Sequence, residues 1–121
     1  MKTCETRTDQ NDTKLETKIL KEMHERLIRS LLDVIILLKL LERTPLSGYD
    51  VIEVIYDELN VSISSGTIYT LLYSMERKEL LEATNGKRKR LYSLTEKGEN
   101  RIKEILQSKK AVCNMLISIL Q

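Results

Sequence analysis

Two helices joined by a very short break are the feature that most limits the folds open to this chain. The first helix is expected to begin at Ser47, which with Asp50 forms the pattern of a capping box. Ser64 is a favourable N-cap for the second helix. Because only Asn60 to Ile63 separate them, the two helices must be neighbours that cross steeply. The sequence therefore predicts a helix-turn-helix.

A β-hairpin is predicted directly after the second helix. The apolar period changes from about 3.6 toward 2 after Glu79, and segments 80–84 and 87–94 flank Asn85-Gly86. This dipeptide favours a two-residue turn with positive φ at both positions. Tyr92 is expected to point inward together with Leu94. The pairs predicted across the hairpin are Thr84 with Lys87, Glu82 with Lys89, and Leu81 with Arg90.

Three further helices are predicted around this unit. Apolar residues recur every fourth position from Leu15 to Leu31 and favour an amphipathic helix over residues 14–30. Segment 31–42 is apolar on nearly every side, which is typical of a central packing helix. Thr95 can cap a last helix that runs to about Leu120. The helix from Ser47 is expected to bury Tyr49, Ile52 and either Ile55 or Tyr56.

Length and composition limit the organisation. The 121 residues suit one domain, and residues 1–13 lack apolar content and are predicted to be disordered. No secretory signal is visible, and the apolar run 31–41 is too short to span a bilayer, so a soluble, cytoplasmic protein is expected. The predicted parts are the N-terminal amphipathic helix (14–30), a central domain (31–94) and a C-terminal helix (95–121).

The residue types present argue against several chemistries. Cys4 and Cys113 are far apart and His24 is the one histidine, so no zinc-ligand spacing exists. Cys113 is expected to be a small core residue, with a bridge between two chains as the alternative. There is no nucleophile near a base and no glycine loop for phosphates, so neither an enzyme nor a cofactor is expected.

The second helix has an unusual predicted outer face. Its core stripe is Ile68, Leu71, Leu72 and Met75, which leaves Ser65, Thr67, Thr70, Ser74, Tyr69 and Tyr73 turned outward. Lys and Glu would be more usual on a surface helix. Capping alone explains Ser64 and Thr67 but not Thr70 or Tyr73. Hydroxyls, exposed helix N-terminal amides and Gly66 together suit phosphate oxygens and base edges.

Charge is unevenly distributed along the chain. Residues 1–63 hold nine Lys/Arg and twelve Asp/Glu, whereas residues 64–121 hold eleven and six. Four of the eleven are consecutive, Lys87 to Arg90, and beside a helix-turn-helix they favour nucleic acid over the alternative of a solvated hairpin tip. Lys89 is expected to be partly neutralised by Glu82, which leaves Lys87, Arg88 and Arg90 free to reach phosphate or a minor groove. The predicted contacts to double-stranded DNA are Ser64, Ser65, Gly66, Thr67, Tyr69, Thr70, Tyr73, Lys87, Arg88, Lys89 and Arg90.

The C-terminal helix carries an apolar stripe wider than a monomer of this size needs. Its members are Ile102, Leu106, Cys113, Leu116 and Leu120. A second copy of the chain would cover such a stripe, which predicts a homodimer. The alternative is that this helix only packs back on residues 31–41.

Four motifs together resemble the PadR-like family of winged-helix transcriptional regulators over about residues 31–105. They are Leu46-Ser-Gly-Tyr-Asp50, Ser64-x-Gly-Thr-Ile-Tyr69 with Leu71-Leu72, Glu79-Leu-Leu81, and Arg90-Leu-Tyr-Ser-Leu-Thr-Glu-Lys-Gly98. The resemblance implies a mainly α winged helix-turn-helix with a small β-hairpin, in which N- and C-terminal helices form a dimer interface. It also implies a repressor whose helix from Ser64 enters the major groove.

Two departures from the family are visible. The position before Gly66, often proline in the family, is Ser65, and both residue types suit a helix start. Some members bind flat aromatic compounds in a cavity lined by tryptophan, whereas this chain has no Trp and no Phe. No particular effector is therefore predicted. A winged-helix module that binds a protein partner remains the alternative function.

Overall fold

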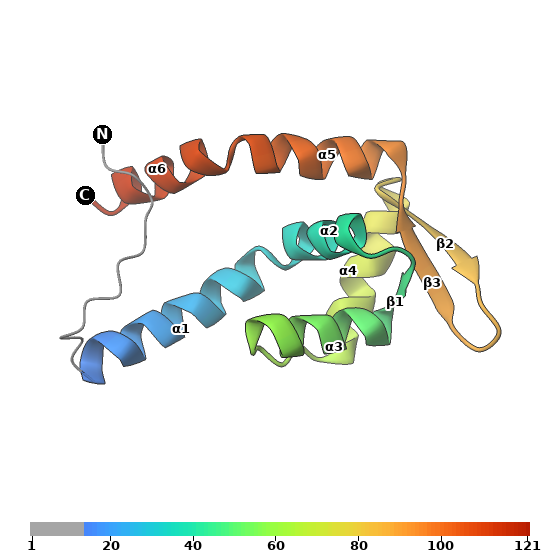
Figure 1. Ribbon diagram of the computed structural model, residues 1–121, viewed down its shortest axis with the longest axis horizontal. Coiled ribbons are helices and arrows are strands. Elements are labelled where there is room, and N and C mark those ends of the chain that lie inside the picture. The colour runs from blue at the N-terminus through green and yellow to red at the C-terminus, as the bar shows by residue number, and fades with distance from the viewer. Residues whose placement is uncertain (1–13) are drawn as a thin grey trace.

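The computed structural model describes residues 14–121, with side chains from residue 17 onward. Within this range the chain is mainly helical, with one small antiparallel sheet (Figure 1). The elements are α1 (Lys14–Ser30), α2 (Leu32–Glu42), β1 (Leu46–Ser47), α3 (Gly48–Leu59), α4 (Ser65–Arg77), β2 (Leu81–Asn85), β3 (Arg90–Leu94), α5 (Glu96–Gln107) and α6 (Lys109–Ile119). The predicted fold class, a winged helix-turn-helix, is confirmed. The predicted disorder of residues 1–13 and Cys4 lie outside the described residues.

The hydrophobic core is built around α2, as predicted. Ile36, Leu37 and Leu40 are almost completely buried and share one cluster with residues of α3, α4, the sheet and α5. In Figure 1 α2 lies between α5 and α3, with α4 crossing behind α3. A helix covered on so many sides must be apolar almost all round, which is the pattern of its sequence.

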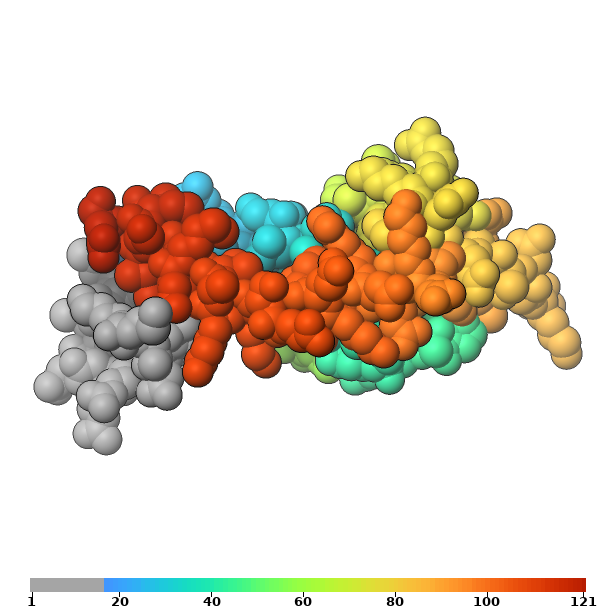
Figure 2. Space-filling view, turned by 90° about the horizontal axis from the view of Figure 1, so that it is seen from above, coloured from blue at the N-terminus to red at the C-terminus, as the bar shows by residue number. Residues whose placement is uncertain are grey.

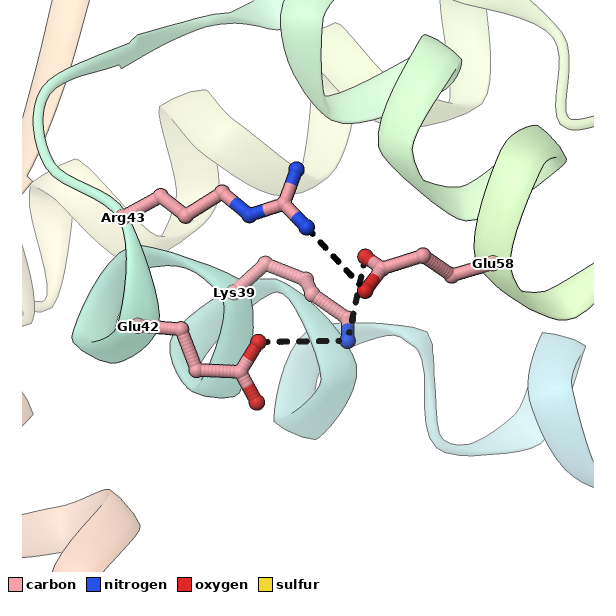
Figure 3. Close-up of polar contacts among 4 residues, drawn as sticks. All are labelled: Lys39, Glu42, Arg43 and Glu58. Carbon is pink, nitrogen blue, oxygen red and sulfur yellow. Dashed lines mark hydrogen bonds and ion pairs between the residues drawn. The ribbon is translucent and has the colours of Figure 1, made fainter.

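Lys39 is the charged exception on α2, and it joins α2 to α3. Its side chain is only 9% exposed, and its Nζ lies 3.4 Å from a carboxylate oxygen of Glu42 and 3.4 Å from one of Glu58. Arg43 reaches the other oxygen of Glu58 at 3.2 Å (Figure 3). The apolar stem of Lys39 is therefore packed inside while its ammonium is neutralised at the edge of the helix pair.

The three predicted N-caps are confirmed. The Ser47 hydroxyl accepts from the Asp50 amide at 3.1 Å, and the Asp50 carboxylate accepts from the Ser47 amide at 3.0 Å, which completes the capping box. The Ser64 hydroxyl accepts from the Thr67 amide, and the Thr95 hydroxyl accepts from the amide three residues on. These side chains satisfy amides that helix geometry leaves unpaired.

The predicted buried face of α3 was wrong in part. Tyr49 is 64% exposed and Tyr56 is 56% exposed, whereas Val51, Val54 and Ile55 are buried. The sequence allows two apolar stripes on this helix. The smaller β-branched residues face the core, and the tyrosines remain at the surface, where their hydroxyls stay hydrated.

The hairpin register differs from the prediction. Asn85 pairs with Arg90, Ala83 with Tyr92, and Leu81 with Leu94, so the loop is residues 86–89, closed by the Gly86 amide bonded to the Lys89 carbonyl at 2.8 Å. Neither turn residue has a positive φ. This register places apolar residues opposite one another and puts the predicted inward residue, Tyr92, wholly inside the core. Burial of that face outweighs the local turn preference.

Two further features were not predicted. The short strand β1 adds a third strand to the sheet, with Leu46 opposite Tyr92 and Ser47 opposite Leu91. The single C-terminal helix is divided at Ser108, so the described residues form six helices instead of five. Within the described residues, no helix is both long and apolar enough to cross a membrane.

Candidate nucleic-acid interface

The outer face of α4 is open to solvent. Thr67, Thr70 and Tyr73 are exposed, as are Ser65 and Gly66 in the first turn. On the inner side Ile68, Leu72 and Met75 are buried, and Leu71 is half-buried, which agrees with the predicted core stripe. The Ser64 and Thr67 hydroxyls lie 2.9 Å apart and hydrogen-bond each other. The outer face therefore presents hydroxyls, amides and a phenol instead of long charged side chains.

Tyr69 is held where α3 and α4 cross. It is half-buried, and a Cβ at Gly48 would lie 2.6 Å from two of its ring carbons. Its ring centroid is 6.3 Å from that of Tyr73, one turn along the same helix. A glycine at the start of α3 thus makes room for an aromatic pair on the edge of the exposed face.

Two of the four consecutive cations of the hairpin are engaged with the helix-turn-helix. A guanidinium nitrogen of Arg90 lies 2.6 Å from the Glu76 carboxylate on α4. The Lys89 ammonium lies 3.7 Å from the Asp50 carboxylate at the start of α3. The predictions that Glu82 neutralises Lys89 and that Arg90 is free were therefore wrong. The register shift sets Glu82 opposite Ser93, and the long cationic side chains reach back to the helices.

The remaining two cations, Lys87 and Arg88, lie in the loop. Both are exposed, and neither makes a hydrogen bond or ion pair with the residues that the structure describes. In Figure 1 this loop projects beyond α3 and α4, at the opposite end of the molecule from α6. Loop 86–89 is therefore the wing, with two free positive charges at its tip.

Hydrogen bonds, burial and charge shift the pKa of several groups near the wing. Hydrogen bonds from Ser47, with the Lys89 charge, lower the pKa of the Asp50 carboxyl below its ordinary value. Burial raises the pKa of Tyr92, an effect partly opposed by the Arg90 charge. The Tyr92 hydroxyl is buried and has no hydrogen-bond partner in the described part of the chain. Arg90 lies over the same ring, with Cζ 5.9 Å from its centroid.

The predicted dimerisation residues are not all at the surface. Ile102 is completely buried in the core of its own chain, so it is not available to a partner. Leu106 and Cys113 are half-buried, and Leu116 and Leu120 are 41% and 75% exposed. Cys113 lies outside the core cluster, so the expectation that it is a small core residue was wrong. The apolar stripe is therefore divided between the core and the surface. α5 packs on α2, whereas α6 extends beyond α2 along the side of the molecule seen in Figure 2.

The apolar face of α1 is also exposed. Ile19, Leu20, Met23 and Leu27 are between 39% and 54% exposed. Among the side chains of this helix that the structure describes, only Ile28 is buried in the core. Figure 1 shows α1 and α6 extending away from the rest of the domain at the same end. Among the described residues, no group of three or more His, Cys, Asp or Glu side chains could hold a metal ion.

Fold and surface together define a winged helix-turn-helix protein with an open second helix and a basic wing. The family can be stated as well: the model of the transcriptional regulator PadR-like family matches residues 37–104, and the chain belongs to this family. The sequence matches no protein with curated annotation.

Solved structures of the family are similar over most of the chain. A PadR family transcriptional regulator from Eggerthella lenta is 25% identical, with a TM-score of 0.68, over 90% of this chain and 98% of that one. A PadR-like regulator from Bacillus cereus is 26% identical, with a TM-score of 0.67, over 79% and 97%. Bacillus subtilis PadR in complex with operator DNA is 28% identical, with a TM-score of 0.54, over 63% and 47%.

Proposed function

We propose that this protein is a dimeric transcriptional regulator that binds specific DNA sequences and represses transcription. In this proposal α4 enters the major groove and the wing contacts the backbone or the minor groove. The observation that carries the proposal is the exposure of Thr67, Thr70 and Tyr73 on a helix joined by an ion pair to the basic wing. The likeness to a relative solved with its operator DNA supports it.

The chemistry of the α4 face suits both parts of a duplex. The first turn, Ser65 to Thr67, exposes amides and hydroxyls that can bind phosphate oxygens at the positive end of the helix dipole. Thr70 and Tyr73 lie further along the same face and can reach base edges. Lys87 and Arg88 can neutralise phosphates from the wing.

A homodimer is part of the proposal. The exposed apolar residues of α6, with those of α1 at the same end of the molecule, form a surface that a second copy would cover. Two copies related by a two-fold axis would present two α4 helices. Such a pair could bind two DNA half-sites that lie one turn of the duplex, ~34 Å, apart. Bound at a promoter, such a dimer would block transcription.

Selection of bound duplexes from a random DNA pool tests this function. We expect a palindromic consensus, a changed consensus for Thr70→Ala, and an unchanged consensus with uniformly weaker binding for Arg88→Ala. The two variants differ because base contacts set sequence preference and phosphate contacts do not. Failure of the wild-type chain to enrich any sequence would contradict the proposal and favour the alternative, a module that binds a protein partner.

A further inference from the structure

We infer that Glu76 and Asp50 are positioning residues for the wing, and that Arg90 and Lys89 support the wing instead of contacting DNA. The inference rests on the proposed DNA-binding function. It divides the basic run into two working parts. Lys87 and Arg88 meet phosphate, while the next two cations hold the hairpin at a fixed angle to α4.

The contact between Arg90 and Glu76 is the stronger of the two. The guanidinium lies 2.6 Å from a carboxylate whose side chain is only 28% exposed, and it also lies over the ring of Tyr92. Charged hydrogen bonds of this kind are stronger than neutral ones, and a cation over an aromatic face adds to them. Because Tyr92 is wholly buried, one of the two groups that the guanidinium contacts is fixed in the core.

The contact between Lys89 and Asp50 is longer but also reaches a fixed group. The two charged atoms are 3.7 Å apart, and the Lys89 side chain is 58% exposed. Asp50 is already held by the Ser47 amide, and Ser47 pairs with Leu91 across the sheet. The carboxylate that receives Lys89 is therefore attached to the same sheet as the wing.

The two contacts restrain the hairpin from two directions. Lys89 and Arg90 reach different helices, α3 and α4, so the base of the wing is joined to both helices of the helix-turn-helix. Transfer of Arg90 to a phosphate would leave Glu76 unpaired on α4 and close to DNA, where its charge would repel the phosphate backbone.

Salt dependence separates a phosphate contact from a supporting contact. The full chain and a selected duplex are used, and affinity is measured at several salt concentrations for Arg88→Gln, Arg90→Gln and Glu76→Gln. We expect Arg88→Gln to reduce the salt slope by about 0.9, the value for one lost phosphate contact. Arg90→Gln and Glu76→Gln should weaken binding by similar factors with the slope unchanged, and the double variant should bind no more weakly than Arg90→Gln.

A matched control corrects for the removal of a negative charge. Glu82 is an exposed carboxylate on β2 with no ion pair in the described part of the chain, so Glu82→Gln measures the general electrostatic effect. Arg90→Lys keeps a cation within reach of Glu76 and should restore most of the affinity. If Arg90→Gln lowers the slope as much as Arg88→Gln, or if Glu76→Gln binds more tightly than Glu82→Gln, the inference is wrong.

A second readout needs no DNA. Hydrogen exchange of the β2 and β3 amides should be faster in Arg90→Gln and Glu76→Gln than in the wild type, and unchanged in Arg88→Gln. Equal exchange in all the variants would contradict the supporting role. Absence of duplex binding by the wild type would instead contradict the proposed function, so the two failures can be told apart.

Discussion

At the scale of one residue, a substitution at Gly66 should affect folding stability and DNA binding in opposite directions. No atom lies within 4 Å of a Cβ built there, so alanine fits the free protein and should stabilise α4 by up to ~1 kcal/mol. In a complex the added methyl would hold the first turn away from the phosphate. We expect Gly66→Ala to raise the thermal midpoint slightly and to weaken duplex binding about tenfold, ~1.4 kcal/mol. Unchanged affinity would show that DNA does not approach this turn.

Asp50 makes stability depend on pH in the acid range. Its pKa is lowered in the folded chain, so its contribution is fully present above pH 3.8 and is lost as the pH falls through the lower, folded value. The free energy of unfolding of Asp50→Asn at pH 7 should therefore be lower than that of the wild type by about 0.5–1 kcal/mol. Denaturant titrations should show this difference narrowing below pH 4. A difference that stays constant down to pH 2 would contradict the assignment.

At the scale of elements, the pair of α2 and α3 depends on Lys39. Lys39→Met keeps most of the buried stem and leaves Glu58 paired with Arg43. It should therefore lower the free energy of unfolding by no more than about 1 kcal/mol. Lys39→Ala removes the stem as well and should cost about 2–3 kcal/mol. Unfolding at one fixed protein concentration measures both. Equal losses in the two variants would mean that the charge, not the stem, holds the helices together.

Local chemistry made several elements predictable from the sequence. The caps at Ser47, Ser64 and Thr95 depend on residues within one turn, and the open face of α4 follows from its own periodicity. The hairpin register was not predictable from local chemistry. The turn preference of Asn85-Gly86 competed with burial of Tyr92 in a core that other elements build. A two-residue strand such as β1 has no periodicity to detect.

The candidate site was predictable to a similar extent. Its location on the second helix and the basic hairpin could be expected from residue types alone. The partners of Lys89 and Arg90 could not, because Asp50 and Glu76 are 39 and 14 residues earlier in the chain and meet the wing only after folding. The same is true of Ile102, which shares a helical stripe with exposed residues but is covered by its own chain.

At the scale of the whole molecule, α6 should join two copies. Leu116→Asp places a charge in the exposed apolar surface and should shift the protein toward monomer, with a loss of binding to the palindromic duplex. Ser118→Asp, on the other side of the same helix, is the matched control and should leave the oligomeric state unchanged. Sedimentation at several concentrations measures both. A wild-type chain that is monomeric at every concentration would rule out this assembly.

In the proposed complex, the outer face of α4 and the wing tip contact the same duplex. Amide chemical shifts of the full chain, recorded with and without a selected duplex, test it most directly. We expect the largest shift changes on Ser65 to Tyr73 and on Gly86 to Arg88, with little change on α6. Large changes elsewhere, with the amides of α4 unperturbed, would contradict it.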